Sequence, residues 1–366
     1  MNTNGTAQLP FDRRDTVVLR GVGILAIVLH NLYHSIPKAP LEMEFGFYPD
    51  RFARFLDIVV DPRQTFQALF SYLGHFGVQL FIFLSAYGLA LTYWNNPPWR
   101  PFVWSRIRKI YPMYFLAVGL WLVLRLIEHR STFPAFLLEN LDELILTTLG
   151  IINVVPFYGL PPVGPWWFLP FIVQFYCLWP ALARLIRRTG SVGLLLLAVL
   201  CLGVTIVFGP ILVHKWWIDL VETPIGHMPE LCLGIAYARY GARVGPVSAL
   251  VAVAVFILGN LHAVFWPLTF VSALTILLYI YQLTARLLRE RRVLQLMGEV
   301  SMPLFFVNGY LRSPFRLIPI HFQRWYVTLL SGLCFAVFSV AVAYWLLKLE
   351  RRLFGRGREE ERQTPP

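Results

Sequence analysis

The chain has 366 residues, of which 57% are hydrophobic and only 14% are charged, and its mean hydropathy is +0.60. A soluble globular domain is about half apolar and about a quarter charged. The composition therefore excludes an ordinary soluble enzyme and predicts a polytopic membrane protein. All four cysteines lie within apolar segments, which argues against a disulfide framework or a zinc site.

About ten apolar runs of roughly twenty residues predict transmembrane helices. They are expected at 16–34, 67–94, 110–127, 166–183, 192–213, 224–240, 246–262, 264–284, 299–318 and 326–348. The predicted fold is an all-α polytopic membrane protein. It divides into a cytoplasmic N-terminal segment (1–15), a membrane domain (16–348) and a charged cytoplasmic tail (349–366).

Basic residues lie mostly in alternate connections between the predicted helices. They are concentrated at 13–14, 100–109, 184–188, 239–243, 286–292 and 348–362. Cytoplasmic connections of membrane proteins carry an excess of lysine and arginine, so both termini are expected in the cytoplasm. The formal net charge of +12 then follows from topology and requires no nucleic-acid partner. The connections at 35–65 and 131–165 are expected to be outer loops.

The first predicted helix carries three ionisable residues, Arg20, His30 and His34. At about 100° per residue, His30 and His34 share one face, and Arg20 lies within roughly 40° of His34 around the helix. Ionisable residues within a bilayer are costly and usually mark a site or a pathway. We expect the three to face a common interior, although a snorkelling arginine and interfacial histidines would give the same pattern.

Four other residues at membrane depth are candidates for a substrate path. His75 and Glu230 are ionisable, and each could instead be an internally satisfied contact. Gln174 could bond between helices or line a path. Trp167 follows a segment rich in proline and glycine, where it could stack on a sugar ring or belong to an interfacial aromatic belt. No cluster has metal-ligand spacing, so no metal site is predicted.

Four stretches carry motifs in a fixed order along the chain. They are an Arg-Gly helix ending in histidine at 19–34, a run at 77–88 similar to V-x-L-F-F-x-L-S-G-F, a basic segment at 102–114 similar to R-x-x-R-I-x-P, and a helix at 167–180 similar to W-x-L…Q-F-Y-L-L-W-P. A weaker fifth match at 298–308 is similar to G-x-x-S-Y-x-L-Y-L-x-H. Together, over nearly the whole chain, they resemble the membrane acyltransferase-3 family, whose members O-acylate carbohydrates.

The chain departs from the family pattern at three places. The family's histidine usually stands eleven residues after the arginine, where this chain has Asn31, and the late histidine is Asn308. The acidic residue often found before Gln-Phe-Tyr is absent. The catalytic base is therefore open between His30 and His34. We favour His30, because it adjoins the family's position.

The resemblance implies transfer of an acyl group, most often acetyl, from cytoplasmic acyl-CoA to a hydroxyl of a cell-surface polysaccharide or its lipid-linked precursor. In that reaction one of the two histidines would be the base, and Arg20 would orient the thioester end of the donor. The residues expected to bind the coenzyme phosphates are Arg106, Arg108 and Lys109, although membrane orientation alone would also explain them. No permanently bound cofactor is implied. The expected location is a bacterial inner membrane, among membrane lipids and proteins of polysaccharide biosynthesis.

A transporter that exports a small acid or a glycan precursor is the alternative. Its substrate site and proton relay would also use arginine and histidine within the membrane. Transporters commonly contain repeated halves, and no internal repeat is detected in this sequence. The four motif stretches therefore favour the enzyme.

Overall fold

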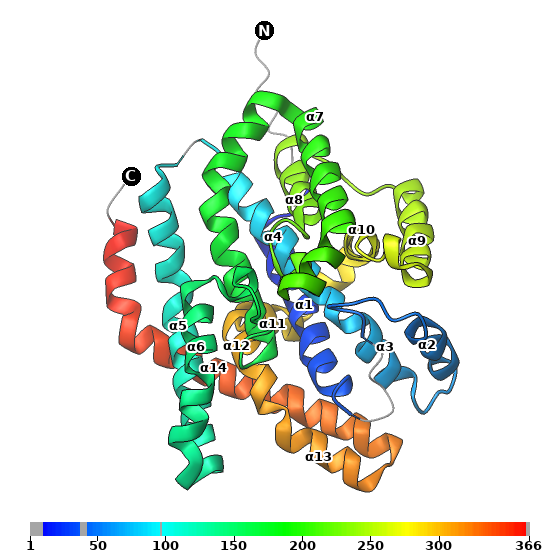
Figure 1. The fold of residues 1–366 in the computed structure, drawn as a ribbon. Helices are drawn as coiled ribbons and strands as arrows, with labels where there is room; N and C mark the ends of the chain where they lie inside the picture. Colours follow the sequence, from blue (N-terminus) through cyan, green and yellow to red (C-terminus); the bar gives the residue numbers. More distant parts are fainter. Residues whose placement is uncertain (1–9, 37–41, 96, 364–366) are drawn as a thin grey trace.

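The computed structural model describes residues 10–36, 42–95 and 97–363, and every regular element in those ranges is a helix (Figure 1). This confirms the predicted all-α class. The α-helices are α1 (Arg13–Tyr33), α2 (Arg51–Val59), α3 (Thr65–Leu73), α4 (Gly77–Thr92), α5 (Trp99–His129), α6 (Phe133–Leu149), α7 (Phe168–Trp216), α8 (Met228–Tyr240), α9 (Pro246–Leu261), α10 (Leu268–Arg289), α11 (Arg292–Glu299), α12 (Ser301–Leu311), α13 (Ser313–Phe322) and α14 (Trp325–Gln363). Two 3₁₀ turns matter for the site, η1 (Gly74–Phe76) and η4 (Gly164–Trp167).

Six segments of the described chain are long and apolar enough to cross a membrane, where about ten were expected. They are Arg13–Tyr33, Thr65–Thr92, Trp99–Leu149, Gly164–Trp216, Leu268–Arg289 and Trp325–Gly355. The fourth contains two of the expected spans, 166–183 and 192–213, which accounts for part of the difference. The other expected spans correspond to α8, α9, α12 and α13, which have 13, 16, 11 and 10 residues. Even 16 helical residues extend only about 24 Å, less than a hydrocarbon core of about 30 Å.

The longest helix, α7, is divided by a sharp break at Gly190. Its 49 residues would extend about 74 Å if straight, far more than one membrane crossing. Gly190 has φ 66° and ψ −154°, a combination that only glycine adopts readily. Figure 1 shows α7 turning back on itself. Its two legs correspond to the helices predicted at 166–183 and 192–213.

The region expected as a second outer loop contains a helix. α6 occupies Phe133–Leu149 and ends at Gly150, which has the left-handed φ of 75°. Its acidic residues Glu139 and Asp142 are exposed on the surface of the helix. Only the part after Gly150 fits the predicted irregular connection.

α1 lies among the other helices, in contact with α3, α4, α11 and α12 (Figure 1). Its first turn is anchored by Asp15, whose carboxylate pairs with Arg289 of α10. Its middle lies very close to α4, since a Cβ added at Gly23 would be 2.8 Å from the carbonyl oxygen of Gly77. Small residues permit this backbone approach between helices. The histidines near the end of α1 are therefore held between neighbouring helices, away from the lipid.

Candidate active site

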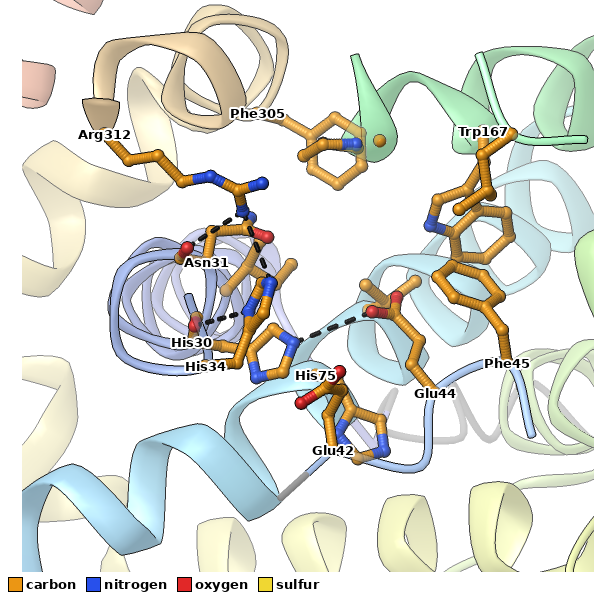
Figure 2. Close-up of a pocket in the computed structure, with 15 residues that line it drawn as sticks. His30, Asn31, His34, Glu42, Glu44, Phe45, His75, Trp167, Phe305 and Arg312 are labelled. Atoms are coloured by element: carbon orange, nitrogen blue, oxygen red, sulfur yellow. Dashed lines mark hydrogen bonds and ion pairs between the residues drawn. The ribbon is translucent and has the colours of Figure 1, made fainter. Parts of the chain in front are cut away.

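A cavity of about 220 Å³ lies beside the C-terminal end of α1 (Figure 2). Ligand pockets for drug-sized molecules are typically 300–1,000 Å³, so this cavity has room for a single small ring rather than an oligomer. Side chains from α1, the connection after it, η1, η4 and α12 converge on it (Figure 2). Its lining residues are Ile27, His30, Asn31, His34, Glu42, Glu44, Phe45, His75, Val78, Leu160, Gly164, Pro165, Trp167, Phe305 and Arg312.

His30 has one ring nitrogen held by the protein and one directed at the cavity. Its Nδ1 lies 3.2 Å from the carbonyl oxygen of Phe70, which can only accept, so Nδ1 carries the hydrogen. The other nitrogen, Nε2, has no hydrogen-bond partner and lies 3.6 Å from the carboxylate of Glu44. A neutral imidazole held in this tautomer presents a basic lone pair at Nε2.

His34 has both ring nitrogens occupied. Nδ1 donates to the carbonyl oxygen of His30 at 2.8 Å. Nε2 lies 3.4 Å from a guanidinium nitrogen of Arg312. The same guanidinium nitrogen donates to the carbonyl oxygen of Asn31 at 2.9 Å. Because a guanidinium can only donate, it favours the neutral form of His34. The two imidazole rings are adjacent, with centroids 4.6 Å apart.

Asn31 and Asn308, which stand where the family pattern has histidine, are hydrogen-bonded to each other. Asn31 Nδ2 donates to Asn308 Oδ1 at 2.5 Å, and both side chains are buried. Asn308 Nδ2 in turn donates to the carbonyl oxygens of Leu304 and Phe305 within α12. The pair therefore links α1 to α12 at the wall of the cavity.

Two residues predicted for the substrate path, His75 and Trp167, line the same cavity. The His75 ring lies 5.4 Å from that of His30, between centroids. Trp167 forms an aromatic wall with Phe45 and Phe305, and its ring centroid is 5.7 Å from that of Phe45. Flat apolar walls beside polar groups suit a ring with hydroxyl groups.

The other two path candidates lie outside this cavity. Gln174 donates to the carbonyl oxygen of Gly150 and to Asn153 Oδ1, so it fixes the turn after α6. Glu230 is buried on α8, with its Oε2 3.8 Å from Nδ1 of His227. The His227 ring stacks on that of Trp167, with the two ring centroids 6.1 Å apart. Glu230 therefore stands one layer behind the cavity wall.

Arg20 faces a different cavity, of about 450 Å³, between the first half of α1 and the second half of α4. It lines that cavity together with Arg13, Ser85 and Thr92. Ten residues separate Arg20 from His30, which corresponds to about 15 Å along the helix axis. The expected common interior is thus two cavities at opposite ends of α1, one with arginines and one with imidazoles.

The predicted coenzyme-binding residues lie on the first turns of α5, which begins before the position expected for it. Arg106 donates to the Tyr93 hydroxyl at 2.6 Å and lies over the Tyr93 ring. Arg108 lies over the exposed ring of Trp104, and Lys109 is exposed. Tyr93 directly follows Thr92, so Arg106 belongs to the same end of the molecule as the Arg20 cavity.

Three charged residues of the site were not predicted as site residues, Glu42, Glu44 and Arg312. Arg20 was selected because it is an ionisable residue inside a predicted span. The same criterion applies to Arg312, which lies within the predicted span 299–318, and would have identified it. No such rule applies to Glu42 and Glu44, which lie in a connection that folds back over the cavity. Glu42 is itself paired with Arg51 of α2 at 3.6 Å.

Two further carboxyl groups, Asp219 and Glu222, are buried in the connection between α7 and α8. Burial raises the pKa of Asp219 to about 6. Burial, and then the like charges of Asp219 and Glu44, raise the pKa of Glu222 to about 8. Glu222 is therefore mostly protonated at neutral pH and adds little negative charge beside Glu44.

No group of three or more His, Cys, Asp or Glu side chains in the described ranges has an arrangement that could hold a metal ion. Comparison with known proteins gives one match. A family model described as an acyltransferase domain matches residues 17–348, nearly the whole chain. No curated protein and no solved structure matches the chain.

Proposed function

The chain belongs to the membrane acyltransferase-3 family, and from this premise we propose that it is an O-acyltransferase that moves an acyl group, most often acetyl, from acyl-CoA to a hydroxyl of a cell-surface glycan or its lipid-linked precursor. One observation carries the proposal. The unpartnered Nε2 of His30 faces a cavity with aromatic walls and lies beside the carboxylate of Glu44.

His30 is the base in this proposal. Its Nε2 accepts the proton of the acceptor hydroxyl while the hydroxyl oxygen attacks the thioester carbonyl carbon. The C–S bond then breaks, and the imidazolium returns the proton to the leaving thiolate. Glu44, 3.6 Å from Nε2, stabilises the imidazolium between these two steps. The Phe70 carbonyl holds the ring orientation throughout.

His34 is a positioning residue in this account rather than the base. Its two nitrogens are already engaged by the His30 carbonyl and by Arg312. To accept a proton at Nε2, it would have to release the guanidinium. This asymmetry favours His30, the same choice that the adjoining family position suggests.

The donor would enter from the opposite end of α1. Arg13 and Arg20 line the larger cavity there, and Arg106 lies nearby on α5. Guanidinium groups bind phosphates with paired hydrogen bonds, which suits the phosphates of a coenzyme. The acyl-bearing arm would have to extend about 15 Å along α1 to reach His30. Arg108 and Lys109 are further candidates for the phosphates at this mouth.

The proposed location is a bacterial inner membrane, with the imidazole cavity toward the outer face and the Arg20 cavity toward the cytoplasm. This arrangement would bring a cytoplasmic thioester to an acceptor outside. Membrane lipids and proteins of polysaccharide biosynthesis are the proposed surroundings.

Acyl transfer by variants of the purified, reconstituted chain tests the proposal. His30→Gln should reduce acceptor-dependent release of coenzyme A thiol by about 10²–10⁴-fold, because the base is lost. His34→Gln should have a smaller effect. Full activity in both single variants and in the double variant would contradict the mechanism. Transport of a radiolabelled acid or glycan precursor with no thiol release would establish the transporter instead.

A further inference from the structure

We propose that His75 binds a second hydroxyl of the acceptor, next to the hydroxyl that His30 deprotonates, so that the site selects a vicinal diol. The inference rests on the proposed acyltransferase function and adds the acceptor's chemical class to it. His75 would determine which acceptor is selected, and it would not remove a proton from the acceptor.

His75 lines the cavity from a point where the helical geometry changes. The segment Thr65–Thr92 is apolar enough to cross the membrane, yet it consists of α3, the 3₁₀ turn η1 and α4, with His75 in the middle of η1. Short 3₁₀ stretches between helical segments often mark functional positions. Irregular backbone at membrane depth is tolerated where it lines a cavity or is buried in protein. Within this continuous helical segment, His75 of η1 lines the cavity.

The ring of His75 is fully enclosed yet has no hydrogen-bond partner in good geometry at either nitrogen. The carbonyl oxygen of Tyr72, one turn earlier, interacts with the ring but can occupy only one of the two nitrogens. A buried polar group without a partner destabilises the folded protein. A cavity occupant that supplies the missing hydrogen bond would remove this cost.

The position of the ring fits a neighbouring hydroxyl. The centroids of His30 and His75 are 5.4 Å apart, with the ring planes inclined at 58°, and both residues line one cavity. Each neutral ring has one donor and one acceptor nitrogen, which matches a hydroxyl group that both donates and accepts. Two adjacent hydroxyl oxygens on one sugar ring can each reach a different imidazole. The small cavity volume also favours one ring that presents two hydroxyls over two separate molecules.

A competing role for His75 is a proton relay with His30. In a relay, His75 would accept a proton from His30, and its loss would slow transfer at whatever hydroxyl is used. In the proposal, its loss also weakens the choice between hydroxyls. The position of the acyl group on the product therefore separates the two roles.

The test uses cells that lack the gene and are complemented with the full chain. The variants are His75→Leu, which removes both nitrogens, His75→Asn, which keeps a donor and an acceptor, and Gln79→Leu as a control. Gln79 lies on α4, four residues after His75, and is also buried. Its side-chain oxygen is unpartnered, and it does not line the cavity. Surface glycan is isolated at mildly acidic pH, so that acyl groups do not migrate, and is analysed by mass spectrometry and NMR.

With the wild type, the acylated hydroxyl should belong to a vicinal pair. Periodate, which cleaves only unmodified vicinal diols, should then spare the acylated sugar wherever the pair is the sugar's only diol. His75→Leu should lower total acylation at least about tenfold and spread the remaining acyl groups over more than one hydroxyl. His75→Asn should restore most of the wild-type position, and Gln79→Leu should retain both amount and position.

The inference is wrong if the acylated sugar has no neighbouring hydroxyl, or if His75→Leu retains the wild-type amount and position. It is also wrong if His75→Leu lowers the amount without changing the position, which is the signature of a relay or of a structural role. Absence of gene-dependent acylation with the wild type would instead refute the proposed function, so the two failures are distinguishable.

Discussion

A methyl group placed at Gly74 should disable the site without unfolding the protein. A Cβ at this position would lie 2.6 Å from the Cβ of His30 and 2.8 Å from the carbonyl oxygen of Ala26. Carbon atoms in good contact are about 3.5–4.0 Å apart, so η1 and α1 would have to separate by about 1 Å. The atoms in the way belong to the backbone and to a Cβ, which cannot rotate aside.

The expected cost of Gly74→Ala has two parts. Overpacking typically destabilises by about 1–3 kcal/mol, which a folded membrane domain can tolerate. A displacement of about 1 Å at a reacting group can reduce the rate by about 10²-fold. We therefore expect kcat for acyl transfer to fall about 10²-fold, while far-UV circular dichroism and the elution volume in detergent stay unchanged.

Gly119→Ala is the matched control, because a Cβ at Gly119 in the middle of α5 would meet no atom within 4 Å. That variant should keep full activity and gain about 0.5–1 kcal/mol of stability from reduced backbone freedom. Wild-type kcat in Gly74→Ala would refute the close contact between η1 and His30. Equal loss in both variants would show that the assay reports general damage to the helices.

Three further predictions concern Arg312, Arg106 and the buried carboxyl group of Glu222. Arg312→Leu should lower kcat/KM at least about tenfold, because the guanidinium donates to both His34 and the backbone of α1. Arg312→Lys should lower kcat/KM less, because it keeps the positive charge. Equal activity of both variants and the wild type in the thiol-release assay would contradict this prediction. Arg106→Ala should raise KM for acyl-CoA about 10-fold or more, with KM for the acceptor unchanged, since a hydrogen bond to a charged group contributes about 1.5–3 kcal/mol. An unchanged KM for acyl-CoA would mean that Arg106 contributes only to the orientation of the chain in the membrane. The pKa of Glu222 is raised to about 8 in the folded protein, above its ordinary value near 4.3, so folding stability falls as pH rises between these values. Glu222→Gln should therefore raise Tm more at pH 9 than at pH 5, and an equal shift at both pH values would contradict the raised pKa.

The sequence predicted the helical class and the imidazole face of α1 because both depend on local rules. Helical periodicity is fixed at about 100° per residue, so the shared face of His30 and His34 could be derived before any packing was known. The same rule placed Arg20 near that face, but it does not predict where along the helix axis a cavity lies. The separation into two cavities arises from the neighbours of α1, which the rule does not describe.

The remaining features depend on contacts between distant segments. Glu44 lies beside His30 because the connection after α1 folds back, and no periodic pattern describes a connection. The helix α6 lies in a region expected as an outer loop, because the exposure of individual helix faces could not be known in advance.

The two asparagines that replace the family's histidines are better understood as one structural change than as two losses. Asn308 uses its Nδ2 within α12, so its Oδ1 is left as an acceptor that needs a donor from α1. Asn31 supplies that donor, and the pair closes the wall of the cavity without leaving a fully buried side-chain atom of either residue unpartnered. Directly beside this pair, His30 keeps the one imidazole nitrogen of α1 that is free to face the cavity. Because the site retains a free imidazole nitrogen and a carboxylate next to it, the substitutions at Asn31 and Asn308 leave the chemical requirement for a base fulfilled.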